Sequence, residues 1–95
     1  MDPKYARFVK KAKETIGATH GNVVTTIFVN EDDKGKPYYR VVQDRKYVWN
    51  GEDCWAITLR PRDLFDAANG AHWASQKIQE RQREDRRRGS LPGPK

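Results

Sequence analysis

The chain has 95 residues and a formal net charge of +6 at pH 7, with 36% hydrophobic and 34% charged residues. A chain of this length supports one small hydrophobic core. It has no apolar run of the roughly 18 residues that a membrane-spanning helix requires, and no apolar segment typical of a secretory signal. The single cysteine, Cys54, excludes an internal disulfide. We therefore expect one intracellular, cytoplasmic domain that does not enter a membrane.

The segment from Lys4 to Ile16 is predicted to form a helix. Its apolar residues recur at steps of three and four positions, which places them on one helical face while the charged residues face outward. Asp2 can cap the free amides of the first turn, and Pro3 fits that turn because no backbone N–H is needed there. Gly17 is the expected end of this helix.

Three strands are predicted to follow. The segment from Asn22 to Asn30 is dense in β-branched residues, the segment from Tyr38 to Trp49 is expected to form one long or bulged strand, and Cys54 to Leu59 forms a third. Asn50 and Gly51 tolerate the positive φ of a tight hairpin turn between the last two strands. These features predict a three-stranded antiparallel meander. Alternation along the first strand places four side chains on one face: Val23, Thr25, Ile27 and Val29.

A second helix is predicted to begin at Pro61, because proline fits a first helical turn, and Asp63 and Asp66 favour the positive end of the helix dipole. Gly70 is expected to kink or divide this helix, since glycine costs on the order of 1 kcal/mol relative to alanine in a helix interior. The fold class is therefore α+β, with an N-terminal helix, the three-stranded sheet and a C-terminal helix. Four apolar residues of the C-terminal helix fall on one stripe: Leu64, Ala68, Ala71 and Ile78.

The folded core is predicted to end near residue 79, because no apolar residue occurs between Ile78 and Leu91. Residues 1–79 form the predicted compact domain. Residues 80–95 form an arginine-rich extension, helical or disordered, with a Pro/Gly tail after Gly89.

Two aromatic residues are predicted to anchor the core. Trp55 lies in the most apolar of the predicted strands, and Phe65 lies near the start of the packed helix. Large aromatic side chains at such positions bury much apolar area.

The positive charge is concentrated at the two ends of the chain. Residues 1–14 carry a net charge of +3, residues 15–76 a net charge of −1 and residues 77–95 a net charge of +4. A near-neutral centre with basic flanks is typical of a folded core that binds a polyanion through its ends. The alternative is that the basic ends only keep a small domain in solution.

Basic residues are candidates for phosphate contacts, and the planar guanidinium of arginine binds phosphates bidentately. In the alternative interpretation, the C-terminal arginines belong to a solvated helix, in which Glu80 pairs with Arg83, or Glu84 with Arg87 and Arg88. Three consecutive arginines exceed these acidic partners, which favours the phosphate contacts. The candidates are Lys10, Lys11, Lys13, Arg40, Arg45, Lys46, Arg81, Arg83, Arg86, Arg87 and Arg88.

Aromatic residues on or beside the predicted sheet are candidates for stacking on nucleobases: Tyr39, Tyr47 and Trp49. Adjacent strand residues point to opposite faces, so one of Tyr38 and Tyr39 faces away from the core. A sheet face with rings beside arginines can stack bases and contact phosphates. The alternative is that the rings form cross-strand pairs and cover the sheet.

No arrangement typical of catalysis or metal binding occurs in the chain. His20 and His72 lack the spacing of a metal site, and Cys54 opens an apolar strand as a core cysteine does. Glycine-rich phosphate-binding motifs and the Gly-x-Ser-x-Gly motif are absent. We therefore predict no catalytic residue, no metal, no cofactor and no enzymatic activity.

The preferred hypothesis is a small nucleic-acid-binding accessory protein that binds DNA or RNA through its basic ends and an aromatic, basic sheet face. The first alternative is a regulator or inhibitor that docks on an acidic protein surface, of the kind found among phage and plasmid accessory proteins. The second is a small toxin-type ribonuclease that uses His20, tyrosine and arginine side chains in acid and base roles. An open sheet edge could also pair two copies of the chain as a homodimer.

Overall fold

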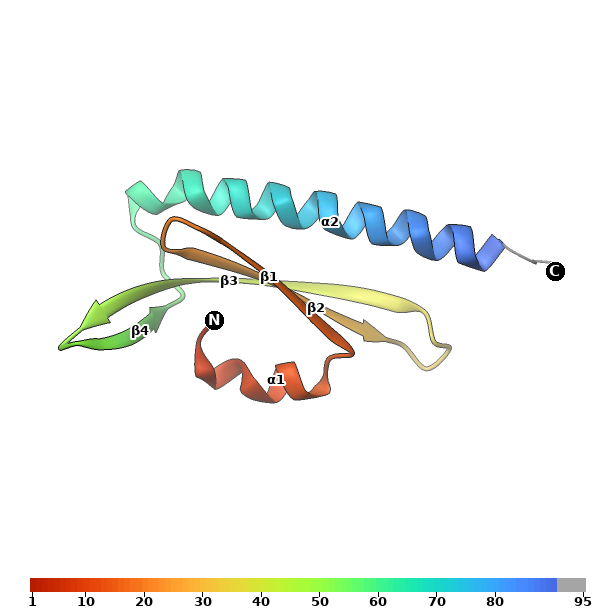
Figure 1. Cartoon of the computed structure of the whole chain (residues 1–95), viewed down its shortest axis with the longest axis horizontal. Helices are drawn as coiled ribbons and strands as arrows, with labels where there is room; N and C mark the ends of the chain where they lie inside the picture. Colours follow the sequence, from red (N-terminus) through yellow and green to blue (C-terminus); the bar gives the residue numbers. More distant parts are fainter. Residues whose placement is uncertain (91–95) are drawn as a thin grey trace.

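The computed structural model describes residues 1–90, in which two helices cover opposite faces of one four-stranded antiparallel sheet (Figure 1). The predicted α+β class is confirmed, with one strand more than expected. A 3-10 turn precedes each helix, at Pro3–Tyr5 and Pro61–Asp63. The elements are α1 (Ala6–Lys11), β1 (Glu14–His20), β2 (Val23–Glu31), β3 (Pro37–Trp49), β4 (Glu52–Ala56) and α2 (Leu64–Ser90).

The sheet is a meander in the order β1-β2-β3-β4. β3 has 13 residues and therefore reaches two partners: residues 37–45 pair with β2 and residues 45–49 pair with β4. Each ladder runs without an interruption. It is thus a long strand without a bulge. The turn after β3 contains Asn50 and Gly51 at φ angles of 51° and 77°, the conformation predicted for them. β4 ends at Ala56, earlier than the predicted end at Leu59.

The predicted helix from Lys4 to Ile16 is wrong in its second half. The helix ends at Lys11, and the segment that was expected to complete it forms β1, the fourth strand. Pairing with β2 decides this outcome, because the Lys13 N–H donates to the Val29 carbonyl at 2.8 Å and the ladder continues along all of β1. Tertiary pairing here overrides a helical periodicity that is only local.

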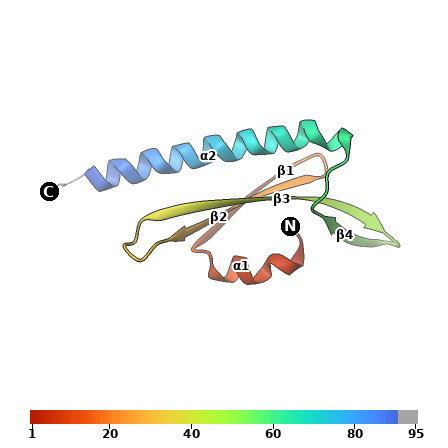
Figure 2. The same ribbon diagram turned by 180° about the vertical axis from the view of Figure 1, so that it is seen from behind.

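The side chains of β2 alternate between the two helices. The four residues predicted to share one face, Val23, Thr25, Ile27 and Val29, are all buried. Ile27 and Val29 pack with Ala74 of α2, and Thr25 lies against Gly70 of α2. On the opposite face, the ring of Phe28 lies 6.4 Å from the ring of Phe8 in α1. The view from behind also shows α1 and α2 on opposite sides of the sheet (Figure 2). The core on the α2 face consists of Ile27, Val29 and Ala74, with Ile16, Tyr39, Trp73 and Ile78 packed against them.

α2 is one uninterrupted helix from Leu64 to Ser90, so the predicted kink or division at Gly70 is wrong. Gly70 is buried against β2, and a Cβ at this position would collide with the Thr25 side chain. The close approach of the helix to the sheet therefore requires glycine here. Apart from Ser90, the tail predicted after Gly89 lies outside the described residues.

The face of α2 that packs on the sheet differs from the predicted stripe, of which only Ile78 contacts the core. Small residues let the helix backbone approach β2 closely, and this contact rotates the larger apolar residues at the start of α2 toward the outside. The exposed residues of the predicted stripe are Leu64, Ala68 and Ala71. Between residues 64 and 88, the buried residues of α2 are Ala67, Gly70 and Ala74.

The two predicted core anchors have different surroundings. Phe65 is 78% exposed, so its predicted role in the core is wrong. Its position follows from the rotation of α2, which buries Ala67 and turns Phe65 away from the sheet. Trp55 is half-buried on the α1 face of the sheet, where Lys46 is its register partner in β3.

Candidate functional site

The register of β3 divides the predicted site residues between the two faces of the sheet. Even-numbered residues of β3 lie on the α1 face, since Arg40 is the partner of Phe28, and odd-numbered residues lie on the α2 face with Ile27. Arg40 and Lys46 are therefore on the α1 face. The predicted site residues on the α2 face are Tyr39, Arg45, Tyr47 and Trp49.

The α1 face contains a hollow lined by three aromatic rings, with a volume of about 230 Å³. Phe28 is only 4% exposed and forms its floor. Phe8 and Tyr38 are 44% and 41% exposed, so parts of both rings are accessible to a ligand. The residues that line the hollow are Phe8, Lys11, Phe28, Asn30, Tyr38 and Arg40.

Positive charges lie in the walls of this hollow, at Lys11 and Arg40, and beside it. Arg7 lies with its guanidinium carbon 4.9 Å from the centre of the Phe8 ring, and that of Arg40 is 5.8 Å from the centre of the Tyr38 ring. Lys46, which is also exposed on this face, has an acidic partner in Asp53. Within residues 1–90, no ion pair neutralises the other four exposed cations of α1 and of this face of β3, which are Arg7, Lys10, Lys11 and Arg40. The α1 face therefore combines accessible rings with positive charge that has no acidic partner. We call these four cations and the hollow the α1-face site.

Two other predicted basic residues do have acidic partners. The Lys13 ammonium lies 2.7 Å from a carboxylate oxygen of Glu31, and the Lys46 ammonium lies 3.3 Å from one of Asp53. These pairs are at least one-third exposed, so they contribute little to stability. They do lower the net positive charge that these two lysines offer to a polyanion.

Arg45 is held by the segment between β4 and α2, which includes the 3-10 turn Pro61–Asp63. Its Nε lies 3.4 Å from Asp63 Oδ2 and donates a hydrogen bond to the Thr58 carbonyl. Arg60 donates to the same carboxylate from its backbone N–H and from its guanidinium, at 2.9 to 3.0 Å. The hydrogen bonds from Arg60, together with the charge of Arg45, outweigh burial and lower the pKa of Asp63 from 3.8 to about 2. Arg45 thus joins the sheet to α2.

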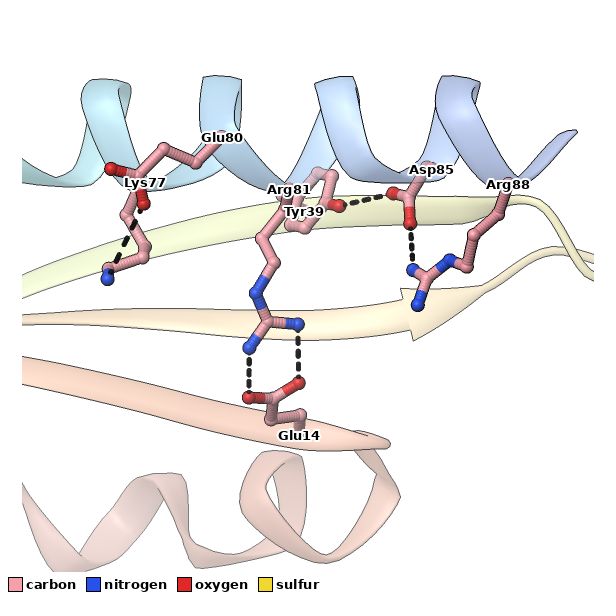
Figure 3. Close-up of polar contacts among 7 residues, drawn as sticks. All are labelled: Glu14, Tyr39, Lys77, Glu80, Arg81, Asp85 and Arg88. Carbon is pink, nitrogen blue, oxygen red and sulfur yellow. Dashed lines mark hydrogen bonds and ion pairs between the residues drawn. The ribbon is translucent and has the colours of Figure 1, made fainter. Parts of the chain in front are cut away.

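The C-terminal half of α2 is held to the sheet by polar contacts (Figure 3). Arg81 donates two hydrogen bonds to the Glu14 carboxylate, at 2.9 and 2.5 Å, and the Tyr39 hydroxyl donates to Asp85 at 2.9 Å. Arg88 donates to the other oxygen of Asp85 at 2.7 Å. The bond from Arg81 lowers the pKa of Glu14, while burial and then the bond to Asp85 raise the pKa of Tyr39 to about 12. The charges of Arg81 and Arg88 are therefore offset by carboxylates.

The other predicted arginines of α2 are exposed: Arg83, Arg86 and Arg87. Glu80 lies 3.7 Å from Lys77, and in the described part of the chain it forms no ion pair with Arg83. Two hollows beside this half of α2, of about 410 and 440 Å³, both include Asp85 in their walls. The larger hollow has three cations and three carboxylates in its walls, and the smaller one has Lys36 and Arg86 beside Asp85. Carboxylates repel phosphate, so these hollows suit a polyanion less well than the α1-face hollow, which has two cations and no carboxylate in its walls.

The predicted aromatic contacts lie outside the α1-face site. Tyr39 is partly covered by α2, while Tyr47 and Trp49 are 38% and 67% exposed on the β3–β4 hairpin. The sequence analysis named Tyr39 and not Tyr38 as a candidate for stacking. Tyr39 packs against the core on the α2 face, and the pairing of Tyr38 with Asn30 places Tyr38 on the α1 face. The residues of the site that the sequence did not single out are Arg7, Phe8, Phe28, Asn30 and Tyr38. Successive side chains of a strand point to opposite faces of the sheet, so the sequence could have placed Phe28 and Asn30 on the face opposite Ile27 and Val29.

The histidines do not form a recognisable catalytic group. His20 is half-buried at the end of β1, and its Nδ1 is buried without a hydrogen-bond partner. His72 lies on the exposed side of α2. Among residues 1–90, no cluster of three or more potential metal ligands occurs. Neither helix in this range has an apolar stretch long enough to cross a membrane.

One end of the molecule exposes large apolar side chains. This end is formed by the β3–β4 hairpin, the connection that follows β4 and the first turn of α2 (Figure 1). The side chains and their exposed fractions are Val48 (65%), Trp49 (67%), Ile57 (64%), Leu64 (57%) and Phe65 (78%). We call this group the apolar end. Comparisons of the chain with protein-family models, curated proteins and solved structures found no match, so its candidate sites are interpreted from its own residues.

Proposed function

We propose that the protein binds nucleic acid through the α1-face site. The observation that supports this proposal is a ring-lined hollow with Lys11 and Arg40 in its walls and with Arg7 and Lys10 exposed on α1. None of these four cations forms an ion pair within residues 1–90. Cations without partners release condensed counterions from a phosphate backbone when they bind it, which favours association. The accessible rings of Phe8 and Tyr38 add a surface on which bases can stack. Neither feature is needed for the packing of α2 on the sheet.

The arginines of α2 have a smaller part in this proposal. Arg81 and Arg88 are bound to carboxylates of the same chain, so a phosphate would have to compete with those partners. Arg83 and Arg86 are exposed and can add phosphate contacts on the other side of the sheet. The proposal therefore assigns the main contact to the α1 face and a secondary one to the end of α2.

The experiment that tests the proposal measures nucleic-acid affinity as a function of salt. Each phosphate contact contributes a slope of about 0.7 to 0.9 in log affinity against log salt. The triple variant Lys10→Gln/Lys11→Gln/Arg40→Gln should therefore flatten the slope by roughly two to three units. Titration of a labelled oligonucleotide followed by fluorescence anisotropy supplies both the affinity and the slope.

The matched control is the triple variant Lys13→Gln/Lys46→Gln/Lys77→Gln. It removes the same formal charge, but from lysines that already have acidic partners. We expect a clearly smaller change in slope for this control. Equal slopes for the two triple variants would show that only net charge matters and would contradict the proposed site. Absence of binding at low salt would contradict the function itself.

A second candidate function is docking on another protein, and the apolar end favours it. Large exposed apolar patches often mark interaction sites on proteins. In this case Trp49→Ser and Phe65→Ser together should abolish stoichiometric co-purification of one partner, while the α1-face triple variant should retain it. Retention of nucleic-acid binding by the Trp49/Phe65 double variant would show that the two surfaces act independently.

A further inference from the structure

We propose that the α1-face hollow holds one unstacked base, so that the protein prefers a single strand to a duplex; this inference rests on the proposed nucleic-acid binding. The hollow has three properties that suit a base. Its floor is the ring of Phe28, its walls include the partly exposed rings of Phe8 and Tyr38, and Asn30 contributes a polar group.

The size of the hollow limits the ligand that it can take. Its volume of about 230 Å³ is below the roughly 300 to 1,000 Å³ of pockets that enclose whole small molecules. A complete nucleotide cofactor would therefore extend far outside it. A single planar base fits the chemistry better, because aromatic walls offer stacking and the sugar and phosphate can remain in solvent.

Asn30 provides the group that can bind a base edge. Its side chain lines the hollow, and within residues 1–90 it makes no hydrogen bond to the protein. A carboxamide has both a donor and an acceptor, which the edge of an unpaired base can satisfy. In a duplex, the faces of the bases are covered by their neighbours and the Watson–Crick edges are paired. The hollow can therefore be filled only when a base leaves the stack.

The cations are placed to hold the phosphates on either side of such a base. Lys11 comes from α1 and Arg40 from β3, so they line the hollow from two different elements. Arg7 and Lys10 extend the positive surface along α1. A strand that crosses α1 and β3 would thus meet a cation before and after the base in the hollow. DNA and RNA share this chemistry.

The first test uses the unchanged protein and compares strands with equal numbers of phosphates. These are an oligothymidylate, an oligouridylate, an abasic deoxyribose strand and a duplex of the same length. We expect the abasic strand to bind about 5- to 150-fold more weakly than oligothymidylate, the range that corresponds to the stacking of one base. The duplex should also bind more weakly per site. Equal affinity for the abasic and base-bearing strands would overturn the inference.

The second test uses a pair of matched tyrosines on β3. Tyr38 and Tyr47 are 41% and 38% exposed, and each carries an arginine guanidinium over its ring, at 5.8 and 5.2 Å, but they lie on opposite faces. Tyr38→Ala should weaken the binding of base-bearing strands by about 5- to 150-fold and leave the abasic strand unaffected. Tyr38→Phe should bind base-bearing strands as tightly as the unchanged protein does, because it keeps the ring. Tyr47→Ala should have no effect.

The outcomes separate this inference from the function on which it rests. If duplex and single strand bind equally well and Tyr38→Ala behaves like Tyr47→Ala, the hollow does not hold a base, although the protein still binds nucleic acid. If no strand binds at low salt, the proposed function fails and the inference fails with it.

Discussion

Arg81 in α2 and Glu14 at the start of β1 form a bidentate ion pair across 67 positions of sequence. The contact joins the first strand, β1, to the last helix, α2 (Figure 3). Both side chains remain partly exposed, at 32% for Arg81 and 42% for Glu14. Solvent therefore screens the pair, and its energetic contribution is small even though its geometry is specific.

Arg81→Gln should lower the free energy of unfolding by about 1 kcal/mol or less, because exposed ion pairs contribute roughly 0 to 1 kcal/mol. A double-mutant cycle with Glu14→Gln, measured by urea titration, isolates the coupling between the two side chains. The control Arg83→Gln removes an exposed arginine that has no ion pair in residues 1–90, and it should leave the stability unchanged. A coupling above about 2 kcal/mol would show that the pair is effectively buried.

Deletion of residues 81–95 should leave a folded domain. Ile78 is the last residue of α2 that packs against the apolar core, and the later contacts are polar. Loss of the Arg81 pair and of the Tyr39 hydrogen bond should cost about 1 to 3 kcal/mol in total. Circular dichroism and urea titration of the truncated chain measure this. Unfolding of the truncated chain at room temperature would show that the predicted core boundary near residue 79 is wrong.

β2 and β3 were predictable from the sequence, because their residues favour a strand and do not also fit a helix. β2 is dense in β-branched and other apolar residues, and the Asn50-Gly51 turn fixes the end of β3. β1 was not predictable in the same way, because Ile16 fits both the helical period from Tyr5 and the alternation of an edge strand. Only the presence of β2 as a partner decides between the two.

The candidate site depended on relationships that a single sequence does not contain. Lys10, Lys11 and Arg40 were identified by their charge, but the ring of Tyr38 was not selected over that of Tyr39. That choice requires the register between β2 and β3, and the contact of Phe8 with Phe28 requires the path of α1 across the sheet. The rotation of α2 likewise depends on how closely Gly70 approaches Thr25.

Gly70→Ala should destabilise the protein even though alanine is the better helix former. Helix propensity alone predicts a gain of about 1 kcal/mol, but the added Cβ would collide with Thr25 and press on the Gln43 amide, 3.1 Å away. We expect a net loss of about 1 to 3 kcal/mol in urea titration. Asn69→Ala, at the exposed neighbouring position, is the control and should be neutral or slightly stabilising. A gain in stability for Gly70→Ala would show that α2 lies farther from β2 than the contact between Gly70 and Thr25 indicates.

Phe65→Ala should change the free energy of unfolding by less than about 0.5 kcal/mol, because the ring is 78% exposed. Ile27→Ala is the comparison, since Ile27 is fully buried and its truncation should cost about 2 to 5 kcal/mol. Both values come from the same denaturant titration. A loss above about 2 kcal/mol for Phe65→Ala would place the ring in the core, and the apolar end would then lose its largest exposed member.

The carboxylate of Asp63 should contribute stability that acid removes. Hydrogen bonds from Arg60 lower the pKa of Asp63 to about 2 in the folded protein, from an ordinary value of 3.8. Because the folded protein holds the proton less tightly than the unfolded chain, this contribution is complete above about pH 4 and is lost as the pH falls through 2. Asp63→Asn lacks the charge and cannot show this loss. Urea titrations of both proteins should therefore give a stability difference that shrinks between pH 4 and pH 2. A difference that stays constant or grows over this range would mean that Arg60 and Arg45 do not stabilise the charged form.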